Sequence, residues 1–331
     1  MPQAGDMRPV IPCLAMVALC LAAGPARSED VARTVVKYDF DIRDVYGNPM
    51  RSPEVDTIAT PNGQRSTVRT GSVNGQKVKL ESVSEKAHTV NDHTRIIERT
   101  IQRYDPNGNP VSVERQRITE TQNPDGTVNA IRETYSSDVN GHMDLKEKSE
   151  TTERKTGAAT MESQTVVSRP SINGGFDVVE RADEQKNASG PGKWSATRAV
   201  YRKGAEGFFE AVKTVTDHAE QGPRETENTA EYEVGSSGAL ELHSQTTKQT
   251  VKAPDGSSVT SIDYFNRHAP GYAITNDQQL ALRVREVVEH RPEGKEGAVD
   301  TLTVQHPSIT DPTRLDPPKV VSETVCTGNC K

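Results

Sequence analysis

The 331-residue chain has little of what normally builds a protein core. Hydrophobic residues make up 32% of it and aromatic residues only 4%, namely one Trp, eight Tyr and five Phe. Ordinary globular domains contain about 45–50% apolar residues when glycine is counted. This shortage excludes a conventional large core, because too few apolar side chains are present to fill one.

Long apolar runs and an excess of positive charge are also missing. No run beyond the N-terminus approaches the about 20 apolar residues that a membrane helix needs. Lys and Arg number 40 against 47 Asp and Glu, a net charge of -7. A nucleic-acid-binding surface normally carries a basic stripe, so no nucleic-acid partner is expected. Charges that alternate in sign and plentiful β-branched residues disfavour full disorder.

The N-terminus has the pattern of a secretory signal. An apolar stretch covers Val10 to Ala23, and small residues follow at Ala26 and Ser28. We expect residues 1–28 to be a cleaved signal peptide, which places the mature chain in the periplasm or outside the cell. A short membrane anchor and a lipoprotein site at Cys20 are the alternatives. The apolar stretch is short for a span, and Leu19 stands where a lipoprotein site wants a small residue.

The mature chain would keep two cysteines. Cys326 and Cys330 lie four positions apart with Gly328 between them. In an oxidising compartment this spacing predicts a small disulfide loop. Linkage between chains, metal or redox chemistry and free thiols are the alternatives.

The most informative pattern is the regular spacing of turn residues along the sequence. Asn-Gly or Asp-Gly pairs supply the positive φ that tight hairpins need, and weaker glycine turns lie between them. The predicted turn centres fall near residues 47, 63, 75, 91, 108, 126, 141, 157, 174, 190, 206, 222, 238, 256 and 271. Steps of about 16 residues leave room for long strands and none for long helices.

These turns predict an all-β protein with about 14 long strands in an antiparallel up-and-down meander. The segments between turns are rich in Thr, Val, Glu, Arg and Lys, and one face is lightly apolar while the other is solvated. We assign residues 29–306 to this meander domain. Residues 307–331 lose the alternation and contain four prolines, so they are expected to form a disordered tail that carries the cysteine pair.

Three architectures fit the meander: a curved single sheet, a large closed barrel and a sandwich. A membrane barrel is disfavoured because charges interrupt the apolar stripe and no aromatic girdles are evident. The expected protein therefore does not span a membrane. Residues 276–291 fit helical spacing and strand alternation about equally well.

No motif in the chain carries chemistry. There is no G-x-S-x-G, no phosphate-binding loop, no dinucleotide fingerprint and no H-E-x-x-H. His88 and His93 are near each other, but a metal needs three or four converging ligands. We therefore predict no catalytic residue, no metal site and no cofactor, and we lean against an enzyme.

A single hairpin turn resembles a known family. Arg103–Val111 resembles one copy of the YD-repeat, the β-repeat of Rhs-type and teneurin-like shells, through Tyr104, Asp105, Gly108 and Asn109. The resemblance covers nine residues and has no second good copy. It implies a shared solution to a hairpin turn rather than family membership.

These observations favour a non-catalytic β-repeat protein, a structural or interaction module of the cell envelope or extracellular space with an unidentified partner there. A soluble carrier is the first alternative, in which a concave sheet face holds a lipid or other apolar ligand. The residues that would line such a face are Phe176, Trp194, Phe209, Leu240 and Leu242. A carbohydrate-active enzyme is the second alternative.

Overall fold

The protein is an array of β-strands. The computed structural model describes residues 32–38, 54–60, 63–73, 76–138, 141–267, 280–294, 297–308, 310–311 and 314–327. The strands are β1 (Ala32–Tyr38), β2 (Glu54–Ala59), β3 (Gln64–Val73), β4 (Gln76–Asn91), β5 (Thr94–Tyr104), β6 (Pro110–Gln122), β7 (Val128–Ser137), β8 (Met143–Lys155), β9 (Thr160–Pro170), β10 (Phe176–Gly190), β11 (Lys193–Gly204), β12 (Gly207–Gln221), β13 (Arg224–Val234), β14 (Leu240–Lys252), β15 (Ser258–Asn266), β16 (Ala281–Glu293), β17 (Gly297–Gln305) and β18 (Lys319–Thr327).

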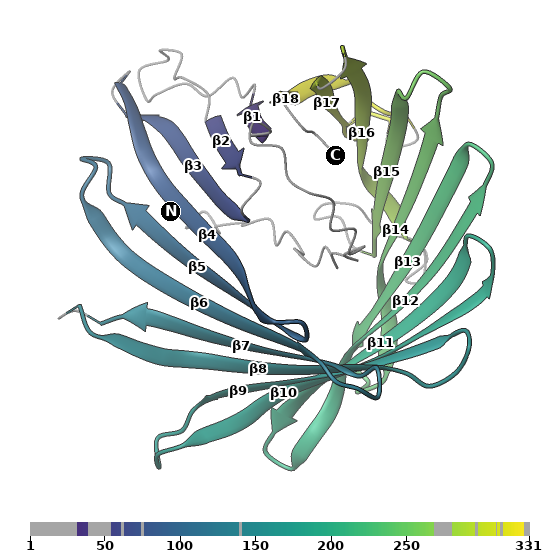
Figure 1. Cartoon of the computed structure of the whole chain (residues 1–331). Helices are drawn as coiled ribbons and strands as arrows, with labels where there is room; N and C mark the ends of the chain where they lie inside the picture. The colour runs from purple at the N-terminus through teal and green to yellow at the C-terminus, as the bar shows by residue number, and fades with distance from the viewer. Residues whose placement is uncertain are drawn as a thin grey trace, which may run out of the picture.

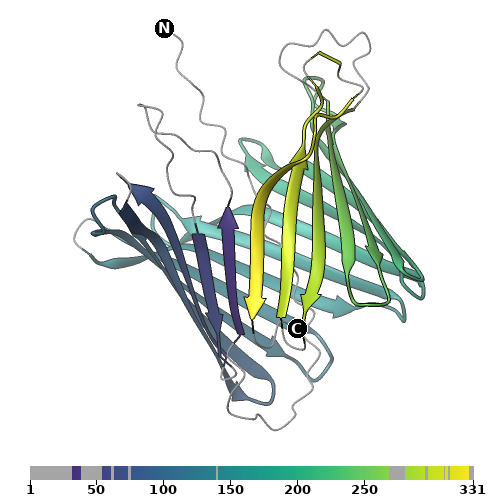
Figure 2. The ribbon, with the colours of Figure 1, turned by 90° about the horizontal axis from the view of Figure 1, so that it is seen from above.

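The strands form one closed ring. Each strand pairs antiparallel with its neighbours in sequence, and β1 also pairs with β18 through six residue pairs, from Arg33–Thr327 to Tyr38–Ser322. Figure 1 shows the strands following one another around the ring, and Figure 2 shows β1 beside β18. The antiparallel meander is confirmed. The expected number of about 14 strands is wrong, because 18 strands close into a barrel rather than an open sheet or a sandwich.

The C-terminal segment completes this ring. Lys319–Thr327 forms β18, which bridges β17 and β1, so the expected disordered tail over 307–331 is wrong for these residues. Four prolines hid the strand, but they all precede it, in the connection from β17. The described part of the ambiguous segment 276–291 is strand from residue 281 onward, because β16 covers Ala281–Glu293.

Glycine turns join many of the strands. In the β5–β6 turn, Gly108 N donates to Asp105 O at 3.0 Å and Asp105 N donates to Asn109 O at 2.9 Å. Gly108 has φ of 85°, a left-handed conformation that other residues rarely adopt. Six further turns share both hydrogen bonds, with the glycine at Gly63, Gly126, Gly141, Gly174, Gly238 and Gly256.

The two ends of the barrel differ in strand register. Turns that join an odd-numbered strand to the next even-numbered strand, from β3–β4 onward, lie at one end of the barrel, which we call the bulge end. Turns that join an even-numbered strand to the next odd-numbered strand lie at the opposite end, which we call the plain end. All eight odd-to-even hairpins from β3–β4 to β17–β18 contain a register shift beside their turn. The extra residue always lies on the even-numbered strand: Leu80, Val111, Lys146, Val179, Ala211, His243, Arg283 and Val321.

The plain end has fewer such shifts. Six of its eight even-to-odd hairpins have none, and the other two have shifts near Val90 and Ser189. A bulge increases local twist and bends its strand. The ring of bulges therefore reshapes the wall at one end of the barrel.

Exposure distinguishes the two faces of the wall. Side chains alternate between faces along a strand, and directly paired residues share a face. Thr250 is 8% exposed, whereas its neighbour Val251 is 47% exposed. Ala182 and Ser322, both 5% exposed, lie on the Thr250 face, and Val259 at 47% lies on the Val251 face. Inward side chains of a closed barrel converge, so the Thr250 face is the inner face.

Candidate functional site: the inner wall of the barrel

The ring is wide enough to enclose a channel. At a strand spacing of about 4.8 Å and a tilt of about 40°, eighteen strands close into a cylinder about 35 Å across. Side chains of opposite walls cannot fill that width, and barrels of about 16–18 strands enclose an aqueous channel. The residues of the inner face are therefore the candidate functional surface.

Hydroxyl pairs line this inner face. Four pairs of directly opposed threonines are joined through their Oγ1 atoms, and such cross-strand pairs stabilise a sheet by about 0.2–1 kcal/mol each. The pairs are Thr57–Thr67 at 3.0 Å, Thr151–Thr165 at 2.9 Å, Thr216–Thr229 at 3.1 Å and Thr250–Thr260 at 2.9 Å. These hydroxyl pairs give the inner wall a polar surface that does not depend on charge.

One side of the inner wall carries alternating arginines and glutamates. Glu85 on β4 lies between Arg65 on β3 and Arg99 on β5 in the register, and Arg99 Nη2 is 2.6 Å from Glu85 Oε2. Arg103 Nε is 3.2 Å from Glu81 Oε2 on the same two strands. This side of the wall is therefore charged but close to neutral.

The opposite side of the inner wall is more acidic. β13 stands nine strands from β4 in the ring of eighteen, so the two face each other across the barrel. Its inner face carries four glutamates, and three of them pair with side chains of β12 or β14. Lys252 Nζ is 3.1 Å from Glu225 Oε2, His218 Nδ1 is 3.9 Å from Glu227 Oε2, and His243 Nδ1 is 3.7 Å from Glu233 Oε2. The fourth glutamate is Glu231.

The single tryptophan lies on the inner face near the plain end. Trp194 on β11 stacks on His218 of β12, with ring centroids 5.0 Å apart and an interplanar angle of 13°. Lys186 Nζ from β10 lies 3.8 Å from the centroid of the tryptophan ring, a cation–π distance. The tryptophan is thus covered by its neighbours rather than presented to a ligand.

The structure does not bring the predicted apolar ligand residues together. Trp194 and Phe209 lie on the inner face, whereas Phe176, Leu240 and Leu242 lie on the outer face. The last three follow their turns by an even number of residues, which suggested a common face. The intervening bulges and the barrel wall separate them from Trp194.

One cysteine of the predicted pair lies in a strand. Cys326 lies on β18, where its sulfur accepts a hydrogen bond from Thr34 Oγ1 at 3.6 Å. Cys330 lies outside the described residues, so the disulfide between Cys326 and Cys330 stays a prediction.

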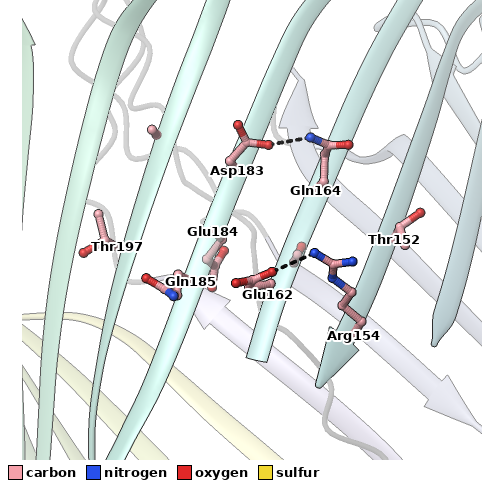
Figure 3. Close-up of a pocket in the computed structure, with 10 residues that line it drawn as sticks. Thr152, Arg154, Glu162, Gln164, Asp183, Glu184, Gln185 and Thr197 are labelled. Atoms are coloured by element: carbon pink, nitrogen blue, oxygen red, sulfur yellow. Dashed lines mark hydrogen bonds and ion pairs between the residues drawn. The ribbon is translucent and has the colours of Figure 1, made fainter. Parts of the chain in front are cut away.

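A polar pocket lies on the outer face at the plain end. Figure 3 shows its side chains converging from β8, β9, β10 and β11. Gln164 Nε2 donates to Asp183 Oδ1 at 2.8 Å, and Arg154 Nη2 is 3.1 Å from Glu162 Oε2. Thr152, Glu184, Gln185 and Thr197 complete the labelled lining. The carboxylates of Glu162 and Asp183 are thus engaged by neighbours, and most of the lining residues lie on the outer face.

The outer face at the bulge end is aromatic. Seven of the ten aromatic side chains that the structure describes lie there, each beside a turn or a bulge. We call them the aromatic rim: Tyr104, Tyr135, Phe176, Tyr201, Phe208, Tyr232 and Phe265. The sequence analysis did not predict the aromatic rim because its residues are scattered along the chain. Their signal is spacing: Tyr104, Tyr135, Tyr201, Tyr232 and Phe265 recur at intervals of 31, 66, 31 and 33 residues, about one or two hairpins.

Neither metal-binding clusters nor spanning helices occur in the described ranges. No group of three or more His, Cys, Asp or Glu residues there could hold a metal ion. None of the described residues belongs to a helix with the length and apolar character needed to cross a membrane.

The geometry defines the chain as a closed 18-stranded up-and-down barrel. No family model matches it, and no curated protein matches it in sequence. Among solved structures it is similar to OpdO from Pseudomonas aeruginosa, with a TM-score of 0.50, 8% identity, and coverage of 90% of this chain and 95% of that one. It is also similar to the outer membrane protein OpdK from Pseudomonas aeruginosa, with a TM-score of 0.49, 10% identity, and coverage of 90% and 98%. At these identities the likeness shows the fold.

These findings correct the expected role. The secreted or periplasmic β-repeat module that does not span a membrane is wrong, and so are its carrier and enzyme alternatives. The finding that overturns them is the closed 18-stranded barrel, the architecture shared with OpdO. The sequence pointed elsewhere because charges lie on both faces of the strands and the aromatic residues are dispersed.

Proposed function

We propose that the protein forms an aqueous channel through an outer membrane. The observation that carries the proposal is closure of the ring between β1 and β18. In lipid, every backbone polar group must be satisfied within the protein, and a closed barrel does this because it has no free strand edge. An exported repeat module would not need this closure.

Strand length and export support the same function. A membrane-crossing strand needs about 9–11 residues, and all strands except β1 and β2 have nine or more. The predicted signal peptide over residues 1–28 would deliver the chain to the periplasm, from which outer-membrane barrels insert. The threonine pairs and the arginine–glutamate rows would face water in the channel.

Charged side chains on the outer wall raise the free energy of inserting the barrel into lipid. Pairing between opposite charges lowers that free-energy cost. Charges placed in a membrane normally pair with one another, because a lone charge next to lipid is expensive. On the outer face, Arg285 Nε is 2.6 Å from Asp263 Oδ1 and Arg33 Nη2 is 2.7 Å from Asp56 Oδ2. Lys148 likewise pairs with Glu150. These charges would approach lipid as neutral units.

The test is solute release from lipid vesicles that contain the full chain. Vesicles loaded with a small hydrophilic dye should lose it when the folded protein is inserted. Val325 on β18 pairs with Val35 on β1 and Val299 on β17, so Val325→Pro removes a ladder hydrogen bond at the seam. This variant should lose the release activity, whereas the β-branched control Val325→Thr should keep it.

The contradicting result is equally clear. Wild-type protein that is folded and inserted, as judged by circular dichroism and co-flotation with the vesicles, yet releases no dye, would overturn the proposed channel.

A further inference from the structure

We infer that the aromatic rim is the contact of this barrel with one membrane–water interface, so that the bulge end lies at the level of the lipid headgroups. The inference rests on the proposed membrane function and adds to it the orientation of the chain. It concerns the outer surface of the barrel, so it does not depend on which solutes pass along the inner wall.

The first support is the shape of the surface. The seven side chains come from six successive hairpins, β5–β6 through β15–β16, at one level of the wall. A protein partner docks on a few neighbouring strands. A belt that follows the wall over six hairpins matches a planar bilayer, which meets the barrel on all sides.

The second support is side-chain chemistry. Tyrosine and tryptophan are enriched at membrane interfaces, where the ring contacts lipid and the polar tip contacts water. Four members of the rim are tyrosines, and none of the rim side chains is fully buried. Leu145 and Leu242 lie directly opposite Tyr135 and Tyr232, and Leu282 lies opposite Phe265. Each of these pairs presents an aromatic and an aliphatic group outward together.

The third support is how the rim forms. Register shifts lie directly at Tyr104, Tyr135, Tyr201, Tyr232 and Phe265, where the odd-numbered strand meets the bulge. On the even-numbered strand, the extra residue shifts the alternation of side chains between the two faces by one position. Residues between the bulge and the turn therefore lie on the outer face, opposite their aromatic partners. The bulges therefore keep apolar pairs on the outer face at this end, above a polar wall.

The opposite end lacks this surface. Its outer face is polar in the region of the pocket that contains Arg154, Glu162 and Asp183. The exposed large apolar residues nearer that end of the described strands are aliphatic, namely Ile58, Val90, Ile131 and the Val251–Val259 pair, and none of them is aromatic. The plain end would accordingly stand away from the interface that the aromatic rim occupies.

Single tryptophans can locate the interface. In a Trp194→Phe background, Tyr232→Trp puts a tryptophan in the rim, and Thr226→Trp puts one on the same strand and outer face, six residues nearer the plain end. Six residues of strand correspond to about 20 Å. Phe265→Trp is a second rim variant in case Tyr232→Trp does not fold. The proteins are inserted into vesicles whose phosphatidylcholine carries bromine either just below the headgroup or deep in the acyl chains.

Headgroup-level placement predicts that bromine near the headgroup quenches the rim tryptophans more than deep bromine does. Because the strands cross the bilayer, Thr226→Trp lies deeper in the hydrocarbon core, so deep bromine should quench it more than bromine near the headgroup does. Rim tryptophans that are quenched most by deep bromine, or the same depth preference at both positions, would overturn the inference. So would inserted protein whose rim tryptophans are not quenched.

Dye release from the same vesicles separates this inference from the proposed function. Release without rim quenching would overturn the placement of the rim and leave the channel standing. Rim quenching without release would keep the membrane contact and overturn the channel.

Discussion

The bulge end and the plain end of this barrel use the same strands but different side chains. At the bulge end, aromatic and aliphatic pairs such as Tyr135–Leu145 lie on the outer face beside register shifts. At the plain end, the outer face holds polar groups such as Gln164 and Asp183, and most hairpins keep a regular register. This difference shows that where apolar residues occur depends on their position along the barrel axis as well as on the face of the wall.

The largest effect should come from removing the rim. The triple change Tyr135→Ser, Tyr232→Ser and Phe265→Ser removes three interfacial anchors and should sharply reduce the fraction of protein that inserts into vesicles, as measured by co-flotation. A matched plain-end triple, Asn129→Ser, Thr226→Ser and Val259→Ser, should insert nearly as well as wild type. Equal loss in both triples would break the distinction between the ends.

A threonine pair near the plain end should have a smaller effect. Thr250 is 8% exposed and its Oγ1 lies 2.9 Å from Thr260 Oγ1. Thr250→Val leaves the partner hydroxyl without this hydrogen bond and should destabilise the barrel by about 1 kcal/mol. The double change Thr250→Val with Thr260→Val should recover part of that loss, because both hydroxyls are gone. Urea unfolding of the inserted protein measures this, and additive losses would contradict it.

The smallest effect should come from acid, and it should be alike at both ends. Hydrogen bonds from the Asn109 backbone and side chain lower the pKa of the Asp105 carboxyl in a bulge-end turn. The Thr127 backbone N–H lowers the pKa of Asp125 in a plain-end turn. A carboxyl whose pKa is lower in the folded state stabilises the turn above its unfolded value of about 3.9. That stability is lost as the pH falls through the folded pKa.

Asp105→Asn and Asp125→Asn should each weaken this acid dependence slightly. Stability of wild type and variants between about pH 6 and pH 2 gives the comparison. A variant that shows the full wild-type dependence would argue that its turn carboxylate contributes nothing.

The positions of the turns were predictable from the sequence, whereas the closure of the strands into a barrel was not. Each predicted turn centre falls between two consecutive strands or on the last residue of one, as at Asn91 and Gly190. Asn-Gly and Asp-Gly pairs carry a local physical requirement, positive φ at glycine, that a reader can find without the fold. The turn at Gly294 and the proline-rich connection to β18 lack that signature, so the turn pattern did not predict β17 and β18.

The candidate site depended on register, which turn signals alone do not give. The slipped spacing of Val111 and Val113 after Gly108 was the visible trace of a bulge, since Val111 is the extra residue of the β5–β6 hairpin. Without the other seven shifts, the faces of residues near each turn could not be assigned. This is why Phe176, Leu240 and Leu242 were grouped with Trp194, although the barrel wall lies between them.

Closure of the ring is tested most directly by joining β1 to β18 covalently. Val35 and Val325 are direct partners although 290 positions separate them in sequence, so Val35→Cys with Val325→Cys, in a chain whose own cysteines are serine, should form a disulfide on oxidation. Denatured, oxidised protein should then migrate faster on gels than its reduced form, because a loop of nearly the whole chain is closed. Free thiols at both positions in folded, oxidised protein would contradict the closed barrel.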